Sequence, residues 1–259
     1  MENKLILTFT ALITFTISVL IAVSLGSYSH QPTGIAVSYV VASSKVQEQT
    51  PAFDTSNFHD PLKIDNKYYS LKPGTIMTFK GADEEGNSML DIITVTNDTK
   101  EVQGISTRVV NDTVFVKGKL EETTNDWYAQ DDKGNVWYMG EDTTDFTNKK
   151  NPQEGSWESG VKGAKAGLIM LAEPEVGVTY DQEVAKGVAE DKATVLSLDN
   201  NVTVPYGSYS NVIKTKEFSA LEPDVVEQKY YAANVGDIKE KTLKGSKEGI
   251  ELVEIKSGN

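Results

Sequence analysis

The sequence predicts a mainly β protein: a curved antiparallel sheet or half-barrel, arranged as a meander, with an N-terminal hydrophobic helix. Short segments rich in Val, Ile, Thr and Tyr alternate between apolar and polar residues, which is typical of strands. Polar turn residues separate these segments at close spacing, and no helical period replaces the alternation. The 259-residue chain is long enough to bury a substantial core.

The central element is a hairpin over residues 126–142, with the sequence DWYAQDDKGNVWYMGED. Two Trp-Tyr pairs, at 127–128 and 137–138, flank the polar tract at 131–135. The aromatic residues favour a half-buried pleated surface, whereas Asp, Gly and Asn favour a tight reversal of the chain. Each face of the hairpin therefore carries large apolar groups that must be covered.

The length of the hairpin loop decides which aromatic residues share a face. A three-residue loop over 132–134, with Gly134 in the left-handed conformation, sets Tyr128 opposite Tyr138 and Trp127 opposite Met139. A two-residue loop would instead set Tyr128 opposite Met139. We expect the three-residue loop.

The remaining strands follow from the same alternation. They are expected at residues 75–80, 89–96, 102–110 and 113–116 before the hairpin, and at 168–171, 176–184, 188–198, 201–205, 212–218, 225–232, 235–243 and 250–255 after it. We expect a turn at Asn97-Asp98 and a long acidic loop over Glu141–Glu158.

An apolar run without charge, Leu5–Leu25, has the length needed to cross a bilayer and follows Lys4. It is either a cleaved signal peptide, with a small-residue site at 22–24, or an uncleaved membrane anchor. Either interpretation places the rest of the chain outside the cytoplasm. The expected organisation is a signal peptide or anchor over 1–26, a flexible tether over 27–55 and a single antiparallel β-domain over 56–259.

Composition excludes several classes of function. The formal net charge is −13 and Arg108 is the sole arginine, so the basic clusters that bind nucleic acid are missing. Cysteine is absent, which excludes disulfides, thiolate metal sites and thiol nucleophiles. With only His30 and His59, neither a His-rich metal site nor most catalytic triads can be built.

Aromatic residues are the candidate ligand-binding groups, although they also suit a filled core. They are Trp127, Tyr128, Trp137, Tyr138, Trp157, Tyr230 and Tyr231. Three carboxylates near the hairpin exit, Glu141, Asp142 and Asp145, are candidate Ca²⁺ ligands or ordinary loop acids. No catalytic residue and no other cofactor is assigned.

Three Asn residues match the N-glycosylation pattern: Asn97, Asn111 and Asn201. All three lie at expected turns, where an exported chain is accessible to modification.

Several stretches together resemble an uncharacterised family of secreted bacterial and archaeal proteins. They are the segments KPGT from Lys72, the hairpin, GSWESGVKGAKAGLIM from Gly155, and VAEDKATVLSLDNNVTVPYGSYSNVIKT from Val188. The segment YYAANVG from Tyr230 departs from the family's Tyr-Tyr-Ala-Pro-Gly-Val-Gly pattern at Ala233 and Asn234. The chain is also distantly similar to LolA-type antiparallel half-barrels, which implies a curved sheet with a concave apolar face.

These observations favour an exported, membrane-tethered domain that binds an apolar or glycan ligand, or a protein segment, on a concave aromatic face without turnover. The alternatives are a carboxylate-dependent extracellular glycoside hydrolase and a purely structural cell-surface module. An open groove would favour binding, two acids converging beside exposed Trp would favour hydrolysis, and a filled interior would favour the structural module.

Overall fold

The computed structural model describes residues 47–48, 50–243 and 248–257. Among those residues, no helix is both long and apolar enough to span a bilayer. The expected signal peptide or anchor, and most of the expected tether, lie outside the described residues. Phe53, near the end of that tether, packs edge-on against Trp137 with 5.2 Å between ring centroids.

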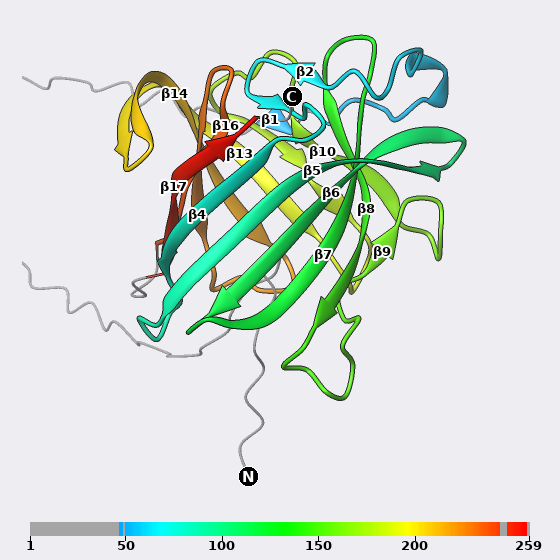
Figure 1. Ribbon diagram of the computed structural model, residues 1–259. Helices are drawn as coiled ribbons and strands as arrows, with labels where there is room; N and C mark the ends of the chain where they lie inside the picture. Colours follow the sequence, from blue (N-terminus) through cyan, green and yellow to red (C-terminus); the bar gives the residue numbers. More distant parts are fainter. Residues whose placement is uncertain (1–46, 49, 244–247, 258–259) are drawn as a thin grey trace, which may run out of the picture.

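The described part of the chain is almost entirely β-structure (Figure 1). Its elements are β1 (Gln47–Glu48), η1 (Thr55–Asn57), β2 (Asp65–Asn66), β3 (Tyr69–Ser70), β4 (Ile76–Ala82), β5 (Ser88–Val102), β6 (Ile105–Val116), β7 (Lys119–Gln130), β8 (Val136–Asp145), β9 (Trp157–Glu158), β10 (Lys165–Met170), β11 (Val178–Asp181), β12 (Glu183–Val184), β13 (Asp191–Val204), β14 (Gly207–Ser219), β15 (Glu227–Ala232), β16 (Gly236–Thr242) and β17 (Gly249–Lys256).

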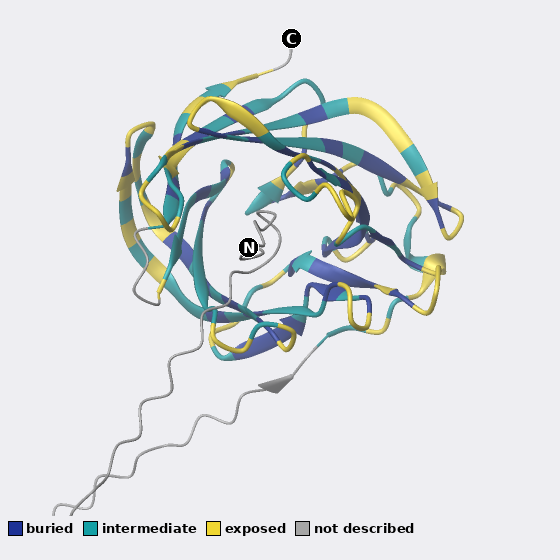
Figure 2. Ribbon diagram, turned by 90° about the horizontal axis from the view of Figure 1, so that it is seen from below, coloured by how far each residue is buried: buried dark blue, intermediate teal, exposed yellow. Residues whose placement is uncertain are grey.

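One antiparallel meander forms a nearly closed barrel, which confirms and extends the expected half-barrel (Figures 1 and 2). Strands β4 to β8 pair in sequence order, as do β13 to β17, and β17 pairs with β4 to join the two halves. On the other side, β11 pairs with β13 while the adjoining β12 pairs with β10. The single segment 178–184 therefore bridges the two ends of the sheet.

Close backbone approach at Gly167 permits this bridge. A Cβ at this position of β10 would lie only 2.1 Å from the carbonyl oxygen of Gln182, which connects β11 to β12. Any side chain larger than hydrogen would push the two segments apart. The requirement for glycine here is steric, because the left-handed backbone conformation is not involved.

Tight two-residue turns connect the long strands β5, β6 and β7. Gln103-Gly104 and Lys117-Gly118 all have positive φ, between 52° and 78°, which is the geometry that matches the twist of paired strands. The turn expected at Asn97-Asp98 is wrong: β5 continues through these residues as a bulge, with a register shift between Val95 and Thr99. The guanidinium of Arg108 donates to the carbonyl oxygen of Asn97 at 3.1 Å and stabilises the bulge.

The acidic stretch after the hairpin is more ordered than expected. Strand β8 continues to Asp145, and Trp157–Glu158 forms β9 against it, so the expected loop over Glu141–Glu158 shortens to residues 146–156. The apolar alternation that predicts strands is absent here. The end of β8 is instead held in the sheet by its pairing with β7, which lies outside this segment.

The central hairpin has the expected three-residue loop. Tyr128 lies opposite Tyr138, and Gly134 has φ 92°. Trp127 does not have a single partner, because the register shifts by one residue between Asp126 and Tyr128, so that it lies opposite the bulge that begins at the expected partner, Met139. The extra residue lies in β8 at Met139–Gly140, where Gly140 has φ 133°. This bulge places Glu141 opposite Asp126.

The short β2–β3 hairpin lies across one end of the barrel (Figure 1). The Asn66 side chain fixes it by donating to the carbonyl oxygens of Gly134 at 2.8 Å and Leu171 at 3.1 Å. The backbone N–H of Asn234, in the β15–β16 turn, donates to the carbonyl oxygen of Lys67 at 2.7 Å. The hairpin is therefore attached to both halves of the barrel.

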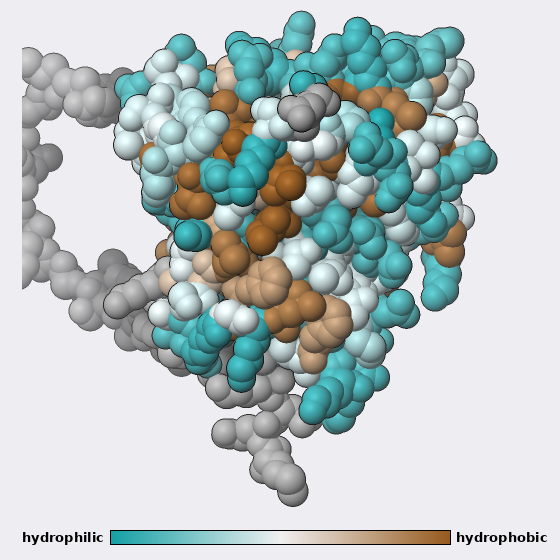
Figure 3. All heavy atoms as spheres, in the orientation of Figure 1, coloured by the Kyte–Doolittle hydropathy of each residue, from teal (hydrophilic) through white to brown (hydrophobic). Residues whose placement is uncertain are grey.

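More buried and less buried residues alternate along several strands, as in β14 (Figure 2). This alternation is expected where successive side chains point to opposite faces of the sheet. On β5, Asp91 and Ile93 face inward, so that Leu90 and Ile92 face outward. Leu90 lies opposite Phe115 of β6, which in turn lies opposite Leu120 of β7. Figure 3 shows apolar residues in a band across this outer face, between hydrophilic margins.

We expect Gly167→Ala to destabilise the fold by about 2 kcal/mol or more, because the added methyl group overlaps the Gln182 carbonyl. Gly118→Ala is the control: nothing lies within 4 Å of its added Cβ, and only the positive φ of 72° is unfavourable, at a cost of about 1 kcal/mol. Urea unfolding followed by tryptophan fluorescence measures both. Equal losses in the two variants would contradict the steric role of Gly167.

Candidate functional site

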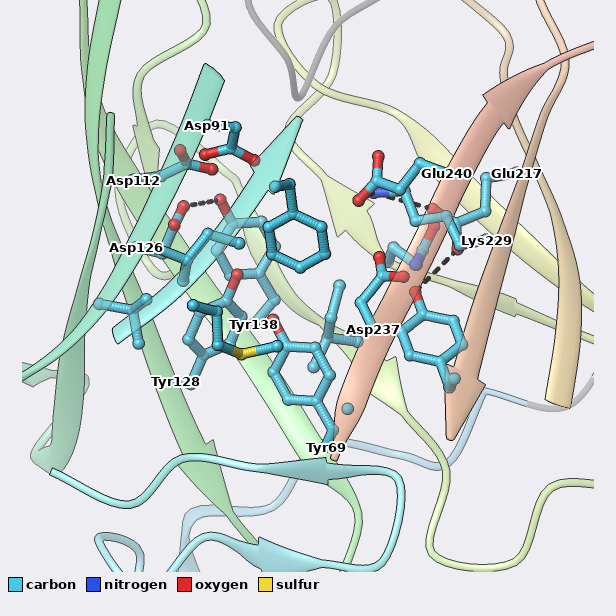
Figure 4. A pocket seen from close by; sticks show the side chains of 18 of the residues that line it. Tyr69, Asp91, Asp112, Asp126, Tyr128, Tyr138, Glu217, Lys229, Asp237 and Glu240 are labelled. Atoms are coloured by element: carbon cyan, nitrogen blue, oxygen red, sulfur yellow. Dashed lines mark hydrogen bonds and ion pairs between the residues drawn. The ribbon is translucent and has the colours of Figure 1, made fainter. Parts of the chain in front are cut away.

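The barrel contains a cavity of about 160 Å³ lined by residues of β3–β8, β10 and β12–β16 and of several connecting segments. That volume would accommodate on the order of ten water molecules. Its lining combines tyrosines with carboxyl groups (Figure 4). Tyr69 and Tyr128 lie nearer the β2–β3 hairpin, whereas Asp91, Asp112 and Glu240 lie farther from it (Figure 4).

The cavity wall is strongly acidic. Ten acidic side chains and one basic side chain line it. The acidic residues are Asp91, Asp112, Asp126, Glu183, Asp191, Glu217, Glu227, Asp237, Glu240 and Glu248, and the basic residue is Lys229. Burial raises the pKa of seven of these acids, Asp91, Asp112, Asp126, Glu183, Glu227, Asp237 and Glu248, and repulsion between neighbouring carboxylates adds to the effect.

Tyr138 bridges two of the buried acids. Its hydroxyl oxygen lies 2.6 Å from Oδ1 of Asp126 and 2.7 Å from Oε2 of Glu141. A phenol has one hydrogen to donate, so the second short contact requires a proton on one of the carboxyl groups. Burial and the neighbouring Glu141 charge raise the pKa of Asp126 well above its usual value, which is consistent with a protonated pair.

Asp91 and Asp112 form a second pair on the same side of the cavity (Figure 4). Asp91 is 3 % exposed, its carboxyl group is hydrogen-bonded to that of Asp112, and no other residue donates to Oδ1 of either residue. Burial, together with the charge of Asp112, raises the pKa of Asp91 well above its usual value. Burial also raises the pKa of Asp112. The pair therefore presents acceptor oxygens to the cavity.

The opposite wall carries the one lysine of the cavity. Lys229 Nζ lies 3.5 Å from Glu217 Oε2 and 3.5 Å from Glu240 Oε1. Burial lowers the pKa of Lys229, but the surrounding carboxylates outweigh burial and raise it above its usual value. The second oxygen of Glu217 accepts from the hydroxyl of Tyr231 at 3.1 Å. This amine is thus committed to the protein's own carboxylates.

Tyrosine rings connect the two walls near the β2–β3 hairpin. Tyr128 stacks on Tyr138 with 4.9 Å between ring centroids, and Tyr69 packs edge-on against Tyr128 at 5.5 Å. Tyr69 also lies 6.5 Å from Tyr231 on the other half of the barrel. Aromatic faces and carboxyl oxygens therefore meet in one enclosed space.

The structure brings three of the seven aromatic candidates into this cavity: Tyr128, Tyr138 and Tyr231. Trp127, Trp137 and Trp157 do not line it and are only 2–7 % exposed. The Trp127 ring lies beneath the Lys100 amine at 4.2 Å. Tyr230 points away from the cavity and donates to Gln228 at 3.0 Å.

The three candidate Ca²⁺ ligands do not converge. Glu141 contacts Tyr138, Asp142 is exposed, and Asp145 caps the following turn by accepting from the backbone N–H of Thr147 at 2.7 Å. Within the described ranges, no group of three or more acidic or histidine side chains is arranged to hold a metal ion.

The three glycosylation candidates lie within strands, so their placement at turns is wrong. Asn97 and Asn201 are exposed beside register shifts of β5 and β13. Asn111 lies in the middle of β6, where its side-chain amide donates to the carbonyl oxygen of Thr124 at 3.3 Å. The Asn97 and Asn201 side chains are exposed, whereas Asn111 is half-buried.

Sequence reasoning missed the acids outside the hairpin region, including Asp91, Asp112 and Glu217. The available signal was positional: Asp91 has the same parity as the apolar residues Ile93 and Val95 in an alternating segment. A charged residue at an inward position of a strand indicates a polar interior.

No family model matches the chain, and no curated protein matches it. Two solved structures are similar in fold, and both are described as putative. One is an exported protein with a YmcC-like fold from Bacteroides fragilis, with 14% identity and a TM-score of 0.44; the match covers 74% of this chain and 100% of that one. The other is a lipoprotein from Parabacteroides distasonis, with 12% identity, a TM-score of 0.40 and the same coverage.

We expect the free energy of unfolding to fall by at least about 2 kcal/mol between pH 5 and pH 9. Burial, with the charge of Asp112, raises the pKa of Glu122 to about 9 from 4.5. A carboxyl group with a raised pKa in the folded state contributes stability below its unfolded pKa and loses that contribution as pH rises through the folded value. Lys229, whose pKa is also raised, keeps its contribution throughout this range.

Urea unfolding at constant ionic strength measures the slope. Glu122→Gln should flatten it, whereas the exposed control Glu254→Gln should leave it unchanged. Stability that is constant or rises with pH would contradict the protonated state of the buried acids.

Proposed function

We propose that this protein is an exported binding protein that holds a small ligand inside its barrel without chemical turnover. The cavity inside the barrel carries the proposal: tyrosine faces and carboxyl groups line a space of about 160 Å³. Ligand sites have this character, with apolar and aromatic walls and a few placed polar groups. The apolar run Leu5–Leu25 supports export, either as a signal peptide or as an anchor.

A purely structural module has less support, because such a domain gains most by filling its interior. Buried carboxyl groups and an unfilled space both reduce stability, and natural cores rarely retain them without a use. Here the hollow is accompanied by unsatisfied acceptor atoms on Asp91 and Asp112. Buried groups that lower stability without improving the packing are more typical of a binding site than of a structural core.

A glycoside hydrolase also has less support. Asp126 and Glu141 do converge, but both contact the Tyr138 hydroxyl, so neither is poised on an open face. The three tryptophans expected to stack on a sugar are at most 7 % exposed. Two acids therefore converge, but the tryptophans are not exposed, so only one of the two observations that would favour hydrolysis is present.

Filling the cavity should abolish binding. The full-length protein is titrated with N-phenyl-1-naphthylamine, a neutral aromatic dye whose fluorescence rises in apolar surroundings. We expect a saturable rise in dye fluorescence that is lost in Ile93→Trp, because Ile93 lines the cavity. Ile92→Trp adds the same ring to the outer face of the same strand and should bind as the wild type does.

Dye binding that is absent in the wild type, or equal in both variants, would overturn the proposal. Circular dichroism spectra and unfolding midpoints of the two variants establish that each is folded before the comparison is made.

A further inference from the structure

Resting on the proposed function, we propose that the cavity selects an organic cation with a protonated amine, whose N–H groups bind the Asp91–Asp112 pair while its apolar part lies against the tyrosines. One region of the cavity is formed by the Asp91–Asp112 pair and the other by the tyrosines, and the chemistry of the two together defines this ligand class.

The Asp91–Asp112 pair has no donor apart from the hydrogen bond between its own two carboxyl groups. Asp91 is only 3 % exposed, both residues line the cavity, and no other residue donates to their Oδ1 atoms. The two carboxyl groups can hold one proton between them, which satisfies one acceptor, whereas an ammonium group supplies three donors and no acceptor. A buried acceptor left without a donor is costly, so the pair gains most from a ligand that donates.

The protein's own amine does not fill this role. Lys229 Nζ lies 3.5 Å from each of Glu217 and Glu240, on the opposite wall (Figure 4). The one basic side chain in the lining is therefore engaged by two carboxylates, while eight further acids line the same space. The imbalance favours a positive ligand and opposes a negative one.

The aromatic end defines the rest of the ligand. Tyr69, Tyr128, Tyr138 and Tyr231 present ring faces and edges beside the apolar side chains of Ile93 and Val95. Rings attract a nearby cation and also cover hydrocarbon. A hydrated metal ion would leave this region unused, whereas an amine on an apolar or aromatic body contacts both regions.

Binding of a cation should expel a proton from the pair. Around the pair stand Glu122 and Asp126 of β7, Asp237 and Glu240 of β16, and Lys229 of β15. Burial, together with the charge of Asp112, raises the pKa of Asp91. An opposite charge between the carboxyls lowers that pKa, so an amine and a proton compete for one place. Amine affinity should then be lower at pH 6 than at pH 8.

Three probes of similar size distinguish the ligand class: 2-phenylethylammonium, neutral 2-phenylethanol and anionic phenylacetate. Each is used to displace N-phenyl-1-naphthylamine from the full-length protein. We expect the ammonium probe to displace the dye at a concentration at least about tenfold lower than the alcohol, and phenylacetate to be the weakest. Lowering the pH to 6 should weaken the ammonium probe alone.

Asp91→Asn tests the assigned contact. It should reduce affinity for the ammonium probe by about tenfold and leave the affinity for the alcohol unchanged. Asp98→Asn, a change of the same kind at an exposed position on the same strand, is the matched control and should alter neither. Asn at position 91 retains the size of the side chain and removes repulsion with Asp112, so the variant is expected to fold.

Each outcome decides between the two proposals. If the dye binds and the ammonium probe is no better than the alcohol, or Asp91→Asn has no effect, the amine inference is overturned while the binding function stands. Calcium chloride is titrated separately, and calcium binding without ammonium binding would also overturn the inference. If neither the dye nor any probe binds, the proposed function itself fails.

Discussion

A barrel whose inner wall carries ten acidic side chains can fold only if most of their charge is neutralised or shared, and this constraint organises the interior. The protein meets it in three ways. The Tyr138 hydroxyl bridges Asp126 and Glu141, the Asp91 and Asp112 carboxyls share a desolvated site, and Lys229 lies between Glu217 and Glu240. Each arrangement reduces repulsion without filling the space.

The bulge at Met139–Gly140 is what makes the first of these arrangements possible. In a regular strand, Tyr138 and Glu141 would point to opposite faces, because three positions separate them. The additional residue restores the same face to both. Gly140 provides the unusual backbone conformation, and a Cβ there would lie 2.4 Å from the carbonyl oxygen of Trp157.

Features of the fold that are set by residues adjacent in the sequence could be predicted from the sequence. The register of the central hairpin followed from the residues of its loop, because turn type fixes strand pairing. The turn expected at Asn97-Asp98 failed because Arg108, on the neighbouring strand, holds the extended chain as a bulge. Turn residues and bulge residues have the same composition, and only the partner strand distinguishes them.

The cavity could be anticipated only in part. Tyr128, Tyr138 and Tyr231 were among the candidate ligand-binding residues, and the structure places them in the cavity lining; their contact with a ligand stays a prediction. The acidic side chains of the cavity were not predicted. Lys229, for example, lies near Glu217 and Glu240 because of strand pairings that no local sequence pattern specifies. The three tryptophans were also candidates, but they are buried and do not line the cavity.

Pairing of β17 with β4 has a consequence for biogenesis. Strand β4 is among the first made, yet its partner is made last of all the strands described. Until then one long margin of the growing sheet has free N–H and C=O groups, which are templates for association with other chains. A polypeptide threaded through a membrane from its N-terminus would expose that margin for the whole passage, so a holdase on the far side would have its greatest effect before the final segment emerges.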